Sequence, residues 1–62
     1  MAVTIHIMPQ GIDGWLLKVE GKPIKDGHFQ TREEALRVAH TMCDTLQADL
    51  LVHHPDGTVT RH

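Results

Sequence analysis

The sequence lacks three features that would narrow its function at once: paired cysteines, a long apolar run and a basic cluster. Cys43 is the only cysteine, so no disulfide forms within the chain, and a lone thiol is typical of a reducing cytosol. No apolar run approaches the ~20 residues of a membrane helix, and no secretory signal precedes the first strand-like segment. We therefore expect a soluble, cytoplasmic protein with no membrane contact.

The charges are few and scattered. Six Lys and Arg stand singly against eight Asp and Glu, and the net charge is −2 at pH 7 with neutral histidines. Nucleic-acid binding relies on a positive patch that displaces counterions from phosphates. The order of charges along the chain indicates no such patch, although folding can still assemble one.

The length allows one domain, residues 1–62. A domain of this size buries only about 60% of the surface that its unfolded chain exposes. We therefore expect a stability of a few kcal/mol, unless a second copy or a partner adds to it.

Segments 3–9 (VTIHIMP) and 15–21 (WLLKVEG) alternate apolar and polar residues, which is typical of half-buried strands. Pro9 is expected to end the first of them, because proline cannot donate to a ladder. Segment 24–29 is a weaker third strand that the Asp26-Gly27 step would interrupt.

A helix is predicted over residues 31–48. Thr31 and Glu34 form a capping box, and Glu33 and Glu34 lie in the first turn, where the helix dipole favours acidic residues. Apolar residues recur at spacings of three and four on one face: Ala35, Val38, Ala39, Met42 and Leu46, with Leu36 and Cys43 at its margins. The polar face is expected to hold Arg32, Arg37, His40, Thr41, Asp44 and Thr45.

Two further strands are predicted, 48–54 and 58–62, joined by a Pro-Asp-Gly turn. The resulting order, β-β-(β)-α-β-β, indicates a two-layer α+β domain with one helix on a mainly antiparallel sheet of four to five strands. The expected core is the helix stripe together with Val3, Ile5, Ile7, Trp15, Leu17, Val19, Phe29, Leu50, Val52 and Val59. No second helix covers the other sheet face, where we expect Met8, Leu16 and Leu51 beside His6, Lys18, His53 and Thr60.

Four short motifs resemble a family of small bacterial proteins known as domain of unknown function 2188. They are Asp-Gly-Trp at 13–15, Phe-x-Thr-Arg-Glu-Glu-Ala at 29–35, Ala-Asp-Leu-Leu-Val-His at 48–53 and Asp-Gly-Thr-Val at 56–59. The resemblance covers residues 4–59 and implies a bacterial cytoplasmic protein with no assigned activity. Members tend to be rich in Lys and Arg and often have glycine after Val-His. This chain is slightly acidic and has His54-Pro55 there, which weakens any nucleic-acid role implied by basic relatives.

A looser similarity, a Gly-Trp and one helix entry, links it to the hybrid-binding module of some ribonucleases H.

Six histidines raise the question of a metal site. If the strand registers allow it, His6, His53 and His62 would converge, and three imidazoles suit zinc. Their spacing matches no known zinc motif, however, and solvated strand histidines are the preferred explanation. His53 and His54 are adjacent, so they point to opposite faces and cannot chelate together.

The cysteine, the aspartates and the tryptophan are better explained by structural roles than by catalytic ones. Cys43 borders the apolar stripe and His40 lies on the polar face, so we do not expect a nucleophile–base pair. Asp13, Asp26 and Asp56 each precede glycine, which is a turn signal. Trp15 is expected to anchor the core rather than to stack on a ligand.

The sequence therefore predicts a non-enzymatic module, without cofactor or metal, that binds a second copy of itself or another protein. Its interaction face would consist of His6, Leu16, Lys18, Leu51 and His53. One alternative is a nucleic-acid-binding accessory protein that uses Lys18, Lys22, Lys25, Arg32 and Arg61. A small histidine-based metal-binding protein is the third.

Overall fold

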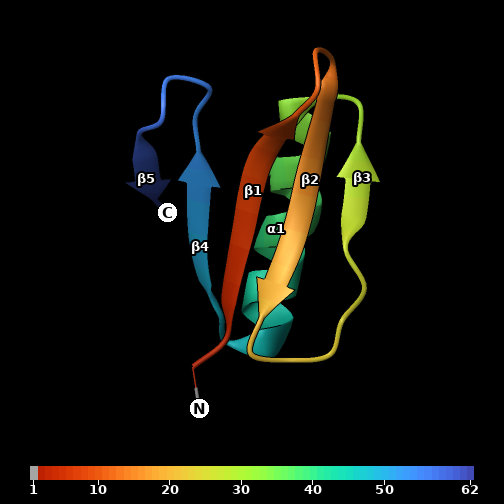
Figure 1. Ribbon diagram of the computed structural model, residues 1–62. Helices are drawn as coiled ribbons and strands as arrows, with labels where there is room; N and C mark the ends of the chain where they lie inside the picture. The colour runs from red at the N-terminus through yellow and green to blue at the C-terminus, as the bar shows by residue number, and fades with distance from the viewer. Residues whose placement is uncertain (1) are drawn as a thin grey trace.

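The chain folds into a five-stranded sheet with one helix packed against one of its faces (Figure 1). The computed structural model describes residues 2–62. The elements follow one another as β1 (Thr4–Gln10), β2 (Gly14–Glu20), β3 (Gly27–Phe29), α1 (Arg32–Leu46), β4 (Asp49–His53) and β5 (Val59–Arg61). This confirms the two-layer α+β prediction, including the short third strand, which begins at Gly27.

The strands lie side by side in the order β3-β2-β1-β4-β5. β1 and β4 are parallel neighbours, and every other pair is antiparallel. Parallel neighbours need a crossover connection, and α1 supplies it by leading the chain from the β3 edge back to β4. The sheet is therefore mixed, with β2 and β3 on the β1 side of this parallel pair and β5 on its β4 side.

Local interactions define both ends of α1. The Thr31 hydroxyl accepts a hydrogen bond from the Glu34 backbone N–H at 3.1 Å, which confirms Thr31 as the N-cap. Gln47 is left-handed, with φ of 55°, and its N–H bonds to the Cys43 carbonyl. This left-handed residue ends the helix at Leu46, two residues before the predicted end.

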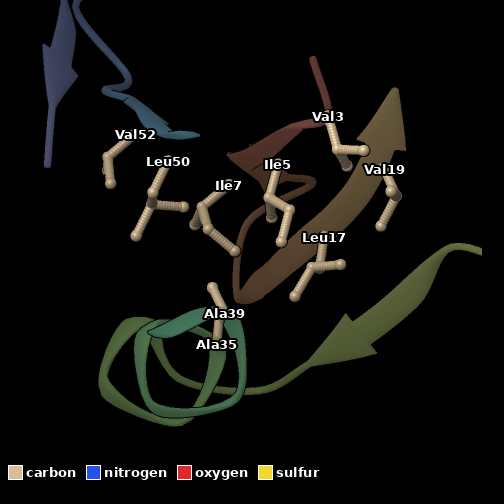
Figure 2. Close-up of a cluster of buried hydrophobic side chains, with 9 residues drawn as sticks. All are labelled: Val3, Ile5, Ile7, Leu17, Val19, Ala35, Ala39, Leu50 and Val52. Atoms are coloured by element: carbon tan, nitrogen blue, oxygen red, sulfur yellow. The ribbon is translucent and has the colours of Figure 1, made fainter. Parts of the chain in front are cut away.

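The core lies between α1 and the sheet (Figure 2). Ile5, Ile7 and Val52 are fully buried, and the helix meets them through two alanines, Ala35 and Ala39. Alanine has no bulk beyond Cβ, so the helix axis can approach the larger strand residues closely. The remaining buried members are Val3, Leu17, Val19 and Leu50, with Trp15 and Phe29 packed at the margin.

Pro9 does not end the first strand as predicted, because β1 continues to Gln10 and pairs Pro9 with Trp15. The β1–β4 ladder stops at the Ile7–Val52 pair. Beyond Ile7, β1 is therefore an edge on its β4 side. An edge tolerates a residue that lacks an N–H donor.

The last strand has the opposite face assignment from the predicted one. Val59 pairs with His53 and Thr60 pairs with Val52, so Thr60 faces the helix side and Val59 the other side. Val59 is 50% exposed and is not part of the core. A shift of one residue in register exchanges the faces of a whole strand, and the turn length decides that register.

Val38 also lies outside the core, with 36% of its surface exposed. At 3.6 residues per turn, Val38 lies about 100° around the helix from Ala39, which faces the sheet directly. Arg32 is seven residues before Ala39 and therefore lies at nearly the same angle around the helix. It is only partly exposed, although it was assigned to the polar face. A single helix on a flat sheet buries a narrower stripe than the sequence pattern suggests.

Candidate functional site

The sheet face opposite α1, here called the open face, carries most of its side chains in three rows across the strands. The first row contains His28, Leu16, Met8, His53 and Val59, the second Lys18, His6, Leu51 and Arg61, and the third Glu20, Thr4 and Asp49. We name them the apolar row, the basic row and the acidic row. The separation of the rows follows from strand register, since residues two apart share a face.

The five residues of the predicted interaction face all lie on the open face. Leu16 and His53 belong to the apolar row, and His6, Lys18 and Leu51 to the basic row. Leu16, Leu51 and both histidines are partly buried, whereas Lys18 is exposed. A hollow of about 410 Å³ lies among them, lined by His6, Met8, Lys18, Val19, Glu20 and His53.

A chain of polar contacts crosses three strands in this hollow. Nδ1 of His6 lies 3.0 Å from Nε2 of His53, and Nε2 of His6 lies 3.3 Å from Oε1 of Glu20. A carboxylate only accepts, so His6 donates through Nε2–H to Glu20 when that contact forms. Its Nδ1 lone pair then accepts from Nε2–H of His53. Glu20 thereby selects one tautomer for each of the two imidazoles.

His62 does not join His6 and His53. Its backbone N–H bonds to the Leu50 carbonyl at 2.9 Å, and its ring lies on the helix side, 6.0 Å from that of His40 between centroids. The convergence of three strand histidines that the registers could have allowed does not occur, because only His6 and His53 meet. Within residues 2–62, no group of three or more His, Cys, Asp or Glu side chains is placed to hold a metal ion.

The basic residues of the nucleic-acid alternative are spread over different parts of the fold. Lys18 and Arg61 lie on the open face, Lys22 and Lys25 in the loop between β2 and β3, and Arg32 at the start of α1. Arg61 lies 3.3 Å from Asp49, and both side chains are mostly exposed, so the pair is worth little in stability. The fold does not bring these five residues together into one patch.

Cys43 lies on α1 in an environment that disfavours its thiolate. Burial raises the pKa of its thiol, and the nearby carboxylates of Asp44 and Asp49 raise it further. A nucleophilic cysteine requires the opposite shift. His40, the base considered for it, is exposed and contacts His62.

The fold and the open face define a class: small α+β proteins in which one helix covers one side of a mixed sheet. The sequence matches the family model of DUF2188, described as an uncharacterized protein conserved in bacteria, over residues 5–61. The chain belongs to this family, as its motifs indicated. No curated protein and no solved structure gives a significant match. Within residues 2–62, no helix has the length and apolar character needed to cross a bilayer.

Sequence reasoning did not identify the contact of Glu20 with His6, and it placed Val59 on the wrong face of the sheet. Glu20 lies on the same face as Lys18, but its contact with His6 depends on the pairing of Thr4 with Glu20. The β1–β2 connection length was the available signal, because it fixes this register. Val59 required the β4–β5 register, which the sequence left open.

Proposed function

We propose that this protein is a non-enzymatic cytoplasmic module that forms a homodimer through its open face. The dimer would have four layers, helix–sheet–sheet–helix, with the two open faces about 10 Å apart, as in other stacked sheets. The observation that carries the proposal is the open face itself, which has partly buried Met8, Leu16 and Leu51 without a covering element.

The small core supports a second copy as the occupant. All nine buried hydrophobic residues lie on the helix side of the sheet or on the helix itself. Domains of this size commonly need disulfides, metals or oligomerisation to be stable. Disulfides are excluded within the chain because Cys43 is the only cysteine, whereas covering the open face would add a second apolar layer.

The three rows favour one orientation of the second copy. A two-fold axis parallel to the strands would place basic row on basic row and acidic row on acidic row. An axis running across the strands, between the apolar and basic rows, instead places the basic row of each copy over the apolar row of the other. The stems of Lys18 and Arg61 would then cover Leu16 and Val59 of the second copy while their charges reach the rim.

The test is molar mass by light scattering for Leu16→Lys, Leu51→Lys and the double variant. We expect the wild type to be a dimer and the double variant a monomer with unchanged circular dichroism, because two buried lysines leave unpaired charges at the interface. Val38→Lys is the matched control, since Val38 is an exposed apolar residue on the helix side. A dimer that persists in the double variant would contradict the proposal. So would a monomeric wild type that binds nucleic acid with steep salt dependence.

A further inference from the structure

We infer that His6 and His53 of two copies together bind one divalent transition-metal cation of the zinc class at the two-fold axis of the dimer. This inference rests on the proposed function. Each copy supplies two imidazole nitrogens, and the four together complete a tetrahedral site, which is the coordination that zinc prefers.

The first support is the contact between Glu20 and His6. A histidine that binds a metal generally donates its other ring N–H to a carboxylate or carbonyl, which fixes its tautomer and orients its lone pair. Glu20 lies 3.3 Å from Nε2 of His6, so Nδ1 of His6 carries the lone pair, and this lone pair faces the His53 ring. The hydrogen bond between His6 and His53 can form without the Glu20 carboxylate. A metal site uses such a carboxylate to orient the histidine that binds the metal.

The second support is the spacing of the two rings. Two imidazoles on one tetrahedral zinc, with bonds of about 2.0–2.1 Å, have their nitrogens about 3.3 Å apart and their centroids about 5.2 Å apart. The rings of His6 and His53 have centroids 5.3 Å apart, and their facing nitrogens are 3.0 Å apart. Binding therefore requires only small ring rotations that turn both lone pairs toward one point. The His53 proton moves from Nε2 to Nδ1, so no net proton is released from the neutral pair.

The third support comes from the register. His6 and His53 lie on adjacent strands β1 and β4 and in adjacent rows, so they occupy one diagonal of a four-residue square. The other two corners are Met8 and Leu51. A two-fold axis across the strands between these rows lays the second copy's histidines over the opposite diagonal. Two crossed diagonals on facing layers form a tetrahedron, and the apolar corners exclude water around it.

The surrounding charges are compatible with a cation. Lys18 is opposite His6 and lines the same hollow, but it is exposed and its flexible stem can carry the ammonium away. Glu20 from each copy adds one negative charge beside the site. In the dimer, two Glu20 carboxylates therefore balance the charge of one divalent ion.

The experiment is calorimetric titration of the full chain with Zn²⁺ at neutral pH, together with molar mass measured in chelator and in zinc. We expect one zinc for every two chains, and at least a tenfold loss of affinity in His53→Gln and in His6→Gln. His62→Gln is the matched control and should bind as the wild type does. Glu20→Gln should bind several-fold more weakly, because the orienting carboxylate is gone while both ligands remain.

The outcomes separate this inference from the proposed dimer. A dimer in chelator whose histidine variants stay dimeric, with no heat on zinc addition, would overturn the metal site and leave the dimer standing. Zinc binding that His53→Gln does not change would also overturn it. A protein that is monomeric in chelator and in zinc would contradict both proposals.

Discussion

The two faces of one sheet differ in almost every property, although the same strands supply both. On the helix side, the residues of β1, β2 and β4 include Ile5, Leu17 and Val52, with exposures of 0–2%. One position along a strand changes this environment, because the residues next to these three lie on the open face among histidines, lysine and glutamate. Among residues 2–62, the buried positions include no polar or charged side chain.

This difference separates the roles of the two faces. The buried positions on the helix side are all apolar, and burial of apolar surface is the main force that stabilises a fold. The open face combines Met8, Leu16, Leu51 and Val59 with ordered rows of charge, which contribute little to the stability of one chain. The helix side therefore supplies most of the stability, and the proposed dimer assigns recognition to the open face.

The largest expected effect compares a truncation on each face. Ile5→Ala removes a fully buried side chain and should cost about 2–5 kcal/mol, which is enough to unfold much of a domain this small. Leu51→Ala on the open face should cost well under half of that in a monomer, because Leu51 is only partly buried. Chemical denaturation measures both.

Both truncations should be measured in the Leu16→Lys background at a concentration where light scattering shows single chains, so that dissociation does not add to the free energy of unfolding. Equal losses from Ile5→Ala and Leu51→Ala would remove the distinction between the faces.

A smaller effect concerns the helix that makes the faces unequal. Thr31→Ala removes the hydroxyl that accepts from the Glu34 N–H and should cost about 1 kcal/mol, or roughly 4–8 °C in midpoint temperature. Thr45→Ala is the control, because its hydroxyl only bonds back to the Thr41 carbonyl within the helix. If the two variants have the same midpoint temperature of unfolding, the cap does not stabilise the helix.

The smallest effect concerns the hairpin that carries Val59 and Arg61 to the edge of the open face. The Thr58 backbone N–H and hydroxyl donate to Asp56, and these bonds lower the pKa of its carboxyl. A carboxyl whose pKa is lower in the folded state stabilises the fold above its ordinary pKa, and this stabilisation disappears as pH falls through the folded value.

Asp56→Ala should therefore have a slightly lower midpoint temperature of unfolding than the wild type at neutral pH. This difference in midpoint temperature should disappear in acid. Asp13→Ala, in the turn between β1 and β2, is the matched control. A gap that stays constant as the pH falls would show that the turn does not depend on the Asp56 charge.

The sequence predicts elements that depend on local pattern. These elements include the alternation at Ile5 and Ile7, the Thr31 cap and the Asp-Gly turn at 56–57. Each depends on a few neighbouring residues, so it can be predicted from the sequence without knowing how the strands pair. The placement of His6, Leu16, Lys18, Leu51 and His53 opposite the core follows from the same alternation.

Features that depend on strand pairing are not accessible in this way. Val59 was assigned to the core because its strand also alternates, but the hairpin register places it beside His53. The contacts among Glu20, His6 and His53 join residues 14 and 47 positions apart and require the order β2-β1-β4, which only the complete fold provides.

The most direct test of the account is the molar mass of the wild type by light scattering behind a sizing column, from micromolar to millimolar concentration. If the open face pairs two copies, the mass will be twice the 7.0 kDa of one chain and will fall to a single chain in Leu16→Lys/Leu51→Lys. A single-chain mass at every concentration, with and without zinc, would contradict the assignment of the open face to self-association.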